Sequence, residues 1–285
     1  QQVADHLNSM GFAADAEHVV TSAMAACDLG KQYIAESGIE RPLAYVIGHD
    51  SFKQLVADAG FELTETADDN PHVVFHGHSP ENNWARLSEG ALAIQRGAHY
   101  FASNLDTTLP SERGFMVGNG SMVAAVTSAT GVAPQSAGKP GPAMFEVAAR
   151  RIGATKPLAV GDRLDTDIAG GNAAGMDTLC TVTGVSTHTD IIDAPSSHRP
   201  TFIAGNLRDH LPGWSASVDE GTNRIRVTAG ELGDVEVMAA EALAVAAPLA
   251  WKLIDDPEIP QITRAENIDF VGADAQAMEA LGGWK

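Results

Sequence analysis

Apolar and polar positions between residues 139 and 175 follow the pattern of a helix, a short strand and a second helix. Pro142 suits a first helical turn, since its missing N–H would have no partner there, and Gly153 marks the expected end of that helix. Leu158–Val160 is apolar and too short for a helix, so we expect a buried strand. This order is typical of a parallel α/β sheet, in which chemistry collects beyond the carboxyl ends of the strands.

Similar patterns along the rest of the chain predict a doubly wound parallel α/β sheet with a smaller α/β domain inserted into it. The expected strands are 18–22, 43–47, 72–75, 99–102, 158–160, 178–182 and 199–204. The expected helices are 3–10, 23–37, 51–59, 83–96, 121–130, 142–152, 206–211, 234–254 and 273–281. Residues 214–218 and 224–228 alternate well enough for a hairpin, and no apolar run is expected to reach the length of a membrane span.

These patterns divide the chain into a first core segment (1–41), an inserted domain (42–134), a second core segment (135–211) and a C-terminal appendix (212–285). Pro42 disfavours continuation of a helix, which suits a crossing into the inserted domain. The composition changes from Pro212 onward. We expect the appendix to pack on the core or to form an oligomer contact, such as a homodimer.

Composition narrows the class of protein. At 285 residues with 44% apolar residues, the chain can bury a core and has room for two domains. The net charge of −19 argues against nucleic acid and anionic membranes as partners. The two cysteines provide no disulfide framework and fit a reducing compartment, so a cytoplasmic location is expected.

Three acids follow the central strand, at Asp162, Asp165 and Asp167. Carboxylates crowded into one loop repel each other unless a cation joins them. Oxygen ligands without thiolate or imidazole favour a hard cation, so Mg²⁺ is expected rather than Zn²⁺. Lys139, at the entrance of the preceding helix, adds a fixed positive charge, and Mg²⁺ with lysine is a combination that handles phosphate.

The loop around these acids carries two smaller expectations. Asp165 or Thr166 is expected to cap the following helix, which ends at Gly175. His188 and Asp190 are expected on a surface connection further along the chain.

The inserted domain offers three weaker signals, each with an alternative. His76 and His78 could form a metal pair, although a polar strand end is favoured because a metal claim needs more ligands. Gly118-Asn119-Gly120 could cradle a phosphate or simply turn into the next helix. Asn104 and Asp106 could contact a substrate or form a structural Asx turn.

Gly138-Lys139-Pro140 followed by Val160–Asp167 resembles the third and fourth motifs of the haloacid dehalogenase (HAD) phosphatases. Asn104–Asp106 and Gly118–Ser121 resemble the NagD-like (type IIA) branch, in which the inserted domain is a large α/β cap. Residues 109–114 and the long appendix are most similar to the actinobacterial glycerol-3-phosphate phosphatases. The resemblance covers roughly residues 3–211 and extends more loosely over the rest.

The resemblance implies Mg²⁺-dependent hydrolysis of a small phosphate monoester through an aspartyl-phosphate. Glycerol 3-phosphate is the first expected substrate, followed by phosphoglycolate and pyridoxal phosphate. Asp162 would ligate Mg²⁺, Lys139 would bind the nucleophile and the phosphoryl oxygens, and Asp167 would orient Lys139 or metal-bound water. Asn104 and Asp106 would contact the substrate from the cap.

One motif of this family does not occur in the chain. The family takes its nucleophile from Asp-x-Asp-Gly-Thr, which is followed by a strand ending in Thr-Asn-Asn, and neither motif is found here. The chain starts at Gln1 without an initiator Met, so we expect a strand–helix–strand unit of about 30 residues to be missing. As written, the chain is expected to be inactive.

Three other classes of protein compete with the enzyme. A non-catalytic α/β binding protein on the same scaffold is the main alternative. A dinucleotide-binding domain is disfavoured because no glycine-rich first turn is followed by an acid at the required spacing. A response-regulator receiver is disfavoured by the inserted domain and by Gly138-Lys139-Pro140.

Overall fold

The computed structural model describes residues 2–284 and contains two compact units. Unit 1 is Gln1–Thr155 and unit 2 is Lys156–Lys285. Both are built on parallel sheets with helices packed on them, which confirms the predicted α/β class. The division into core, cap and appendix stays a prediction.

Unit 1 is organised around a five-stranded sheet in the order β2-β1-β3-β4-β7, with every neighbouring pair parallel. The central strands are buried at nearly every position because helices cover both faces, as is usual for parallel sheets. These strands are β1 (Leu43–Ile47), β2 (Glu62–Thr64), β3 (Val73–His76), β4 (His99–Ala102) and β7 (Gln135–Ser136).

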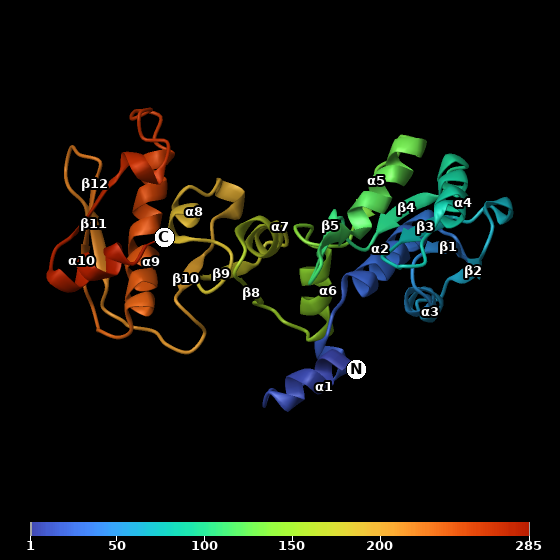
Figure 1. Ribbon diagram of the computed structural model, residues 1–285, viewed down its shortest axis with the longest axis horizontal. Helices are drawn as coiled ribbons and strands as arrows, with labels where there is room; N and C mark the ends of the chain where they lie inside the picture. The colour runs from blue at the N-terminus through green and yellow to red at the C-terminus, as the bar shows by residue number, and fades with distance from the viewer. Residues whose placement is uncertain (1, 285) are drawn as a thin grey trace. The chain divides into compact units, whose positions relative to one another are not determined.

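Five helices cover the two faces of this sheet (Figure 1). Helices α2 (Ser22–Ser37), α3 (Asp50–Asp58) and α6 (Ala143–Arg151) pack on one face, around the stacked rings of Phe75 and Phe101. Helices α4 (Trp84–Gln95) and α5 (Asn119–Thr130) pack on the other. Side chains cap the starts of α2 and α4, where Thr21 accepts from Met24 N–H and Asn83 accepts from Arg86 N–H.

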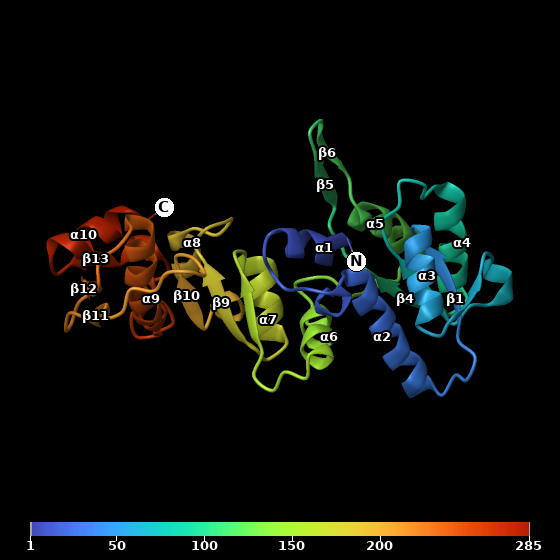
Figure 2. The same ribbon diagram turned by 90° about the horizontal axis from the view of Figure 1, so that it is seen from below.

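A two-stranded hairpin projects from unit 1, as Figure 2 shows. It consists of β5 (Thr108–Ser111) and β6 (Gly114–Val117), which within residues 2–284 pair only with each other. Every residue of β6 is exposed, including Phe115 at 81%. The sequence patterns did not predict these strands.

Unit 2 contains two three-stranded sheets that share one core. The first has the parallel order β10-β9-β8, from β8 (Leu158–Gly161), β9 (Asp177–Thr181) and β10 (Phe202–Ala204). The second has β12 between an antiparallel β11 and a parallel β13, from β11 (Ser215–Val218), β12 (Arg224–Thr228) and β13 (Asp269–Gly272). The remaining elements are α7 (Ala169–Ala173), α8 (His188–Ile192), α9 (Val235–Ile254) and α10 (Ala275–Gly282).

Helix α9 lies between the two sheets of unit 2 (Figure 1). The residues that surround it come from the expected core segment and from the appendix alike, so the appendix packs within this unit. By length and composition α9 could cross a membrane, which corrects the expectation that no segment reaches that length. The apolar residues of α9 are explained by its place in the core of unit 2, because 56% of the apolar stretch is buried inside the structure.

Two expected elements differ from the structure, and a third agrees with it. Residues 18–22 do not form a strand: a 3₁₀ turn at Ala16–His18 is capped by Asp15, and α2 begins at Ser22. Residues 206–211 do not form a helix, because the Asn206 side chain accepts from the next amides and Leu211 N–H is held by Glu241. The first helix, α1 (Gln2–Ser9), is close to its expected position.

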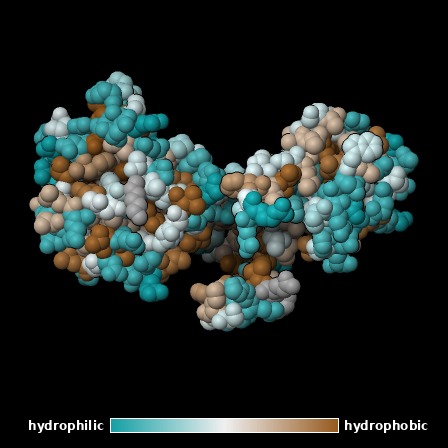
Figure 3. Space-filling model, viewed as in Figure 1, coloured by the Kyte–Doolittle hydropathy of each residue, from teal (hydrophilic) through white to brown (hydrophobic). Residues whose placement is uncertain are grey.

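Exposed apolar residues mark one edge of unit 2. Among the described residues, strand β8 pairs with β9 on one side only, and Leu158 and Val160 are 48% and 44% exposed. A parallel strand is usually covered on both faces and rarely has apolar side chains in water. Elsewhere on the face shown in Figure 3, hydrophilic and hydrophobic residues are interspersed over both units.

Candidate active site

The predicted acid loop follows β8 in unit 2. Strand β8 ends at Gly161, and the chain then turns through a π-helical segment, Leu164–Ile168, into α7. Asp162 and Asp167 are half-buried in this turn. The loop therefore lies at the carboxyl end of a parallel strand, as the sequence predicted, which is the usual place for a site in such sheets.

Asp167 is packed against the end of β8. A Cβ atom at Gly161 would overlap the Asp167 side chain, so the strand can approach this carboxylate only because residue 161 is glycine. The backbone N–H of Asp167 donates to Arg163 O at 2.9 Å, which closes the turn. The side chain is thus held by local packing rather than extended into solvent.

Asp162 is held by the loop that follows β9. Val185 N–H donates to Asp162 Oδ2 at 3.1 Å, and Ser186 N–H donates to the Asp162 carbonyl at 3.1 Å. Gly184 packs so closely on this carboxylate that any Cβ would overlap it. Ser186 Oγ in turn accepts from Leu164 N–H at 3.1 Å, so the two loops form one hydrogen-bonded unit.

A buried cysteine lies under both carboxylates. Cys180 pairs with Gly161 across the sheet and has no exposed surface. Burial raises the pKa of its thiol to about 12, and the negative charges of Asp162 and Asp167 add to that rise. The two carboxylates therefore lie close enough to one buried group to act on it together.

Asp165 has a different role from the one expected. Arg163 Nε donates to Asp165 Oδ1 at 2.7 Å and its Nη2 donates to Oδ2 at 3.1 Å, so the guanidinium lowers the pKa of that carboxyl. The turn starts at Arg163 without a side-chain cap. The prediction that Asp165 or Thr166 caps this helix is therefore wrong, because the chain forms a π turn whose first acid pairs with its neighbour.

Unit 1 brings the other predicted site residues to the carboxyl edge of its sheet. Lys139 is exposed in the loop between β7 and α6, and the preceding Gly138 packs against Asn104. Asn104 Oδ1 accepts from Asp106 N–H at 3.2 Å, and Asn119 Nδ2 donates to the Asn104 carbonyl at 2.8 Å. Asn104 thus forms the Asx turn that was one of its two interpretations, and Asp106 is exposed beside it.

The Gly118-Asn119-Gly120 segment is explained by close packing. Gly118 and Gly120 lie directly on the backbone of residues 105–108, where a Cβ at either position would overlap main-chain atoms. Gly120 N–H donates to Asp106 O at 2.8 Å. This geometry matches the turn into α5.

The histidines singled out in the sequence lie in different environments. His76 is fully buried and its Nδ1 lies 2.8 Å from the hydroxyl of Tyr100, whereas His78 is exposed. Within residues 2–284, no group of three or more His, Cys, Asp or Glu side chains could hold a metal ion. His188 is buried, which corrects its expected surface position, whereas Asp190 is exposed as expected and completes a capping box with Thr187 at the start of the short helix α8.

The acid loop fits a hard cation in its chemistry. Its donors are carboxylate oxygens, with neither imidazole nor a reactive thiolate, and Mg²⁺ keeps several waters when only one or two carboxylates bind it. By donor type, the loop therefore fits a magnesium ion bound by Asp162 and completed by other ligands and water. Lys139 belongs to unit 1 and the acid loop to unit 2.

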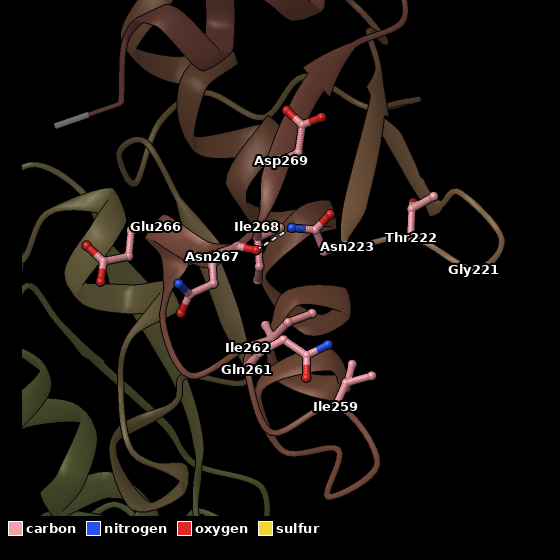
Figure 4. A pocket seen from close by; sticks show the side chains of 10 residues that line it. All are labelled: Gly221, Thr222, Asn223, Ile259, Gln261, Ile262, Glu266, Asn267, Ile268 and Asp269. Carbon is pink, nitrogen blue, oxygen red and sulfur yellow. Dashed lines mark hydrogen bonds between the residues drawn. The ribbon is translucent and has the colours of Figure 1, made fainter.

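A separate surface hollow of about 1050 Å³ lies in unit 2 and shares no residue with the acid loop (Figure 4). Its polar groups are partly engaged with each other, since Asn223 Nδ2 donates to Asn267 O. Its lining residues are Gly221, Thr222, Asn223, Ile259, Gln261, Ile262, Glu266, Asn267, Ile268 and Asp269.

Comparison with known proteins gives the class. A haloacid dehalogenase-like hydrolase family model matches residues 1–62, and a HAD-hydrolase-like model matches residues 136–210. The D-glycerol 3-phosphate phosphatase of Mycobacterium tuberculosis is 40% identical over 247 residues, which cover 82% of this chain and 68% of that protein. The 5'-nucleotidase YutF of Bacillus subtilis is 35% identical over 214 residues, covering 74% and 80%. The chain belongs to the haloacid dehalogenase-like hydrolases.

Solved structures agree with this assignment. A glycerol phosphate phosphatase from Mycobacterium tuberculosis in complex with calcium matches with a TM-score of 0.78 and 37% identity, over 100% of this chain and 83% of that one. The same protein in complex with magnesium gives a TM-score of 0.75. A thermostable p-nitrophenylphosphatase variant from Bacillus stearothermophilus gives 0.66 and 34% identity, over 73% and 79%.

These relatives confirm three sequence-based predictions: the HAD family, the class of phosphoric monoester hydrolase, and a divalent cation as cofactor. The p-nitrophenylphosphatase neighbours agree with the NagD-like branch.

Proposed function

We propose that this protein, with its nucleophile in place, hydrolyses glycerol 3-phosphate with Mg²⁺ through an aspartyl-phosphate. The observation that carries the substrate is the likeness to a D-glycerol 3-phosphate phosphatase, at 40% identity. Nucleoside 5'-monophosphates are the second candidate, because a 5'-nucleotidase is 35% identical. In both cases the partner is a small phosphorylated metabolite.

The proposed roles follow the chemistry of each side chain. Asp162 would ligate Mg²⁺, which when bound supplies positive charge that shields the nucleophile from the phosphate. Lys139 would hold the nucleophile and phosphoryl oxygens in line, and Asp167 would orient Lys139 or metal-bound water. Asn104 keeps its role in the Asx turn, so we assign it to shaping the cap loop and leave Asp106 as the cap residue that would contact substrate.

The nucleophile would come from a strand that pairs with the open edge of β8. Within residues 2–284 no strand pairs with that edge, and the side chains of Leu158 and Val160 on β8 are exposed. A strand placed there would end beside Asp162, because parallel neighbours end at the same edge of a sheet. An Asp-x-Asp-Gly-Thr strand would thereby gain both a partner and a place at the acid loop.

The proposal is tested by phosphate release from glycerol 3-phosphate, phosphoglycolate, pyridoxal phosphate and nucleoside 5'-monophosphates, each with Mg²⁺ and with EDTA. Two proteins are compared: this chain, and a longer chain that begins with an Asp-x-Asp-Gly-Thr strand. We expect activity in the longer chain only, lost with EDTA and highest on glycerol 3-phosphate. No release from any ester by a well-folded longer chain would favour the non-catalytic binding protein.

The role of Lys139 is tested by Lys139→Ala in the active protein. We expect a loss of about 10²-fold or more in kcat, because a fixed charge aimed at the reacting phosphate is removed. Lys156→Ala is the matched control, since Lys156 is also exposed. It lies after α6, whereas Lys139 lies before that helix. Near-normal turnover in Lys139→Ala would refute the assignment.

A further inference from the structure

Among the described residues of unit 1, three buried polar atoms have no hydrogen-bond partner. They are Nε2 of His76, Oδ1 of Asn82 and Oδ1 of Asn119. His76 is 0% exposed and Asn119 is 2% exposed, so bulk water does not satisfy their side chains. A buried polar atom without a partner costs about 1–3 kcal/mol, and each such atom in a native protein needs an explanation.

Contacts bring these three side chains to one corner of the domain. His76 ends β3 on the face of the sheet that α4 and α5 cover. Asn82 Nδ2 donates to Gly77 O at 3.0 Å and lies 3.5 Å from the sulfur of Met122 in α5. Met122 lies three residues after Asn119 on the same helix, hence on the same side of α5. The free atoms therefore lie between the end of β3 and the first turn of α5.

The donors and acceptors at this corner are complementary to a particular group. The Tyr100 hydroxyl lies 2.8 Å from His76 Nδ1, and which of the two donates depends on the tautomer of the ring. Burial lowers the pKa of His76 to about 4, which keeps the ring neutral at pH 7. In the tautomer in which the Tyr100 hydroxyl donates, the ring proton sits on Nε2, and the corner offers one N–H donor and two amide oxygen acceptors.

We propose that His76, Asn82 and Asn119 form a subsite for a vicinal diol, the alcohol part of the phosphate ester that the protein hydrolyses. Two neighbouring hydroxyls donate to the two amide oxygens, and one of them accepts from His76 Nε2–H. This inference rests on the proposed function and specifies its selectivity. A single trapped water offers the same two donors and an acceptor, and is the competing occupant.

The position of the cluster suits a substrate subsite. Asn119 Nδ2 donates to the carbonyl of Asn104, in the loop that contacts Gly138 next to Lys139. The subsite therefore adjoins the loop of the lysine assigned to the phosphoryl group. Asn82 is half-buried while its neighbours Glu81 and Asn83 are exposed, so the cluster approaches the surface at the loop that follows β3.

The test compares two ligands that differ only in hydroxyls, glycerol 3-phosphate and n-propyl phosphate. Binding to this 285-residue chain is followed by NMR, using shifts of the Asn side-chain amides and the dissociation constant. We expect glycerol 3-phosphate to bind at least about tenfold more tightly, as one to two buried hydrogen bonds would give. Asn82→Leu should abolish this preference while binding of n-propyl phosphate stays unchanged.

Gln54→Leu is the matched control, because it also replaces an amide side chain of unit 1, on an exposed site of α3. The proposal is overturned if the wild-type chain binds both ligands equally or neither, or if Asn82→Leu keeps the preference. A change only in thermal stability in Asn82→Leu would assign the corner to a trapped water. His76→Gln is the second variant, expected to weaken glycerol 3-phosphate selectively in the same assay.

The outcome separates this inference from the proposed function. Diol-selective binding without phosphate release from any ester by the longer chain would leave the subsite and remove the phosphatase assignment. Release of phosphate from n-propyl phosphate and from glycerol 3-phosphate at equal kcat/KM would support the phosphatase assignment and remove the diol subsite.

Discussion

Single glycines determine how closely the backbone can approach the two carboxylates of the acid loop. Gly184 lies on Asp162 and Gly161 lies on Asp167, and neither position has room for a methyl group. Neither glycine adopts a left-handed conformation, so the requirement is one of space. The choice of amino acid can therefore be as restricted at a position that never contacts a substrate as at one that does.

Gly184→Ala should displace Asp162 and weaken Mg²⁺ binding by about tenfold or more, in line with other changes to the groups that position a metal ligand. Overpacking should also lower the free energy of unfolding by about 1–3 kcal/mol. Calorimetric Mg²⁺ titration and urea unfolding measure the two effects. Gly282→Ala, at the end of α10, is the control, because its methyl group would meet no other part of the fold within 4 Å; it should leave Mg²⁺ binding unchanged and should not lower the free energy of unfolding.

The two thiols should respond to pH in a defined direction. Burial raises the pKa of Cys27 and of Cys180 from 9.0 to about 12. The folded state therefore holds these protons more tightly than the unfolded state, so their contribution to stability is complete below pH 9 and is lost as the pH rises toward 12. Replacing Cys180 with Ala should reduce the slope of unfolding free energy against pH above pH 9; an unchanged slope would contradict this.

At the scale of elements, an ion pair fastens the end of α9 to the segment before β10. Arg199 donates to Asp255 and to the carbonyl of Ala194, and its guanidinium lies 5.4 Å from the centre of the Trp251 ring. The Arg199 side chain is only 14% exposed. This arrangement combines charge, hydrogen bonding and stacking, which an exposed pair lacks.

Arg199→Leu should cost about 2 kcal/mol of unfolding free energy, because a buried carbonyl and a carboxylate lose their donor. Arg41→Leu is the control: its pair with Glu62 is 79% and 55% exposed, so it should cost less than about 1 kcal/mol. Urea unfolding of both variants gives the comparison, and equal losses would refute it.

A proline lies inside the longest helix. Pro248 removes one backbone donor from α9, yet the helix runs unbroken from Val235 to Ile254. Pro248→Ala should raise the free energy of unfolding by about 1–3 kcal/mol, since a helix hydrogen bond becomes available. Pro260→Ala, in the loop after the helix, should instead be neutral or slightly destabilising. Thermal unfolding of the two variants distinguishes the effects, and a fall in Pro248→Ala would show that the ring is needed for packing.

Sequence patterns located most elements because strands and helices here repeat at their own periods and end at glycines or caps. They failed where a side chain competed with the backbone. Asn206 accepts from two following amides, so residues 206–211 turn instead of forming a helix. Asp15 caps a 3₁₀ turn in the same way, where a strand had been expected. Strand β13 was missed because it is held by pairing with β12, a contact distant in sequence.

The candidate site shows the same limit. Spacing and residue type singled out Asp162, Asp167 and Lys139 as candidates, because motifs are local. The hydrogen bond from Val185 to Asp162, and the corner formed by His76, Asn82 and Asn119, depend on segments that meet only in the fold. No periodicity in the sequence indicates such meetings.

At the scale of the whole molecule, the charge of −19 opposes the approach of an anionic ester. Salt screens exposed charges over about 10 Å at 0.1 M ionic strength. In the active protein, raising KCl from about 0.01 to about 0.2 M should therefore lower KM for glycerol 3-phosphate severalfold with little change in kcat. A rise in KM would show instead that the local charge of Lys139 governs encounter.

The buried thiols also leave the chain without a cysteine that a thiol-reactive dye can label. Cys27 belongs to unit 1 and Cys180 to unit 2, and both are shielded and protonated at neutral pH, so a maleimide dye has no native target. Cysteines introduced at the exposed positions Gln54 and Glu220 would then be the only labelled sites, one on each unit. Energy transfer between a dye pair at these positions would follow how the two units move when Mg²⁺ and a phosphate ester bind.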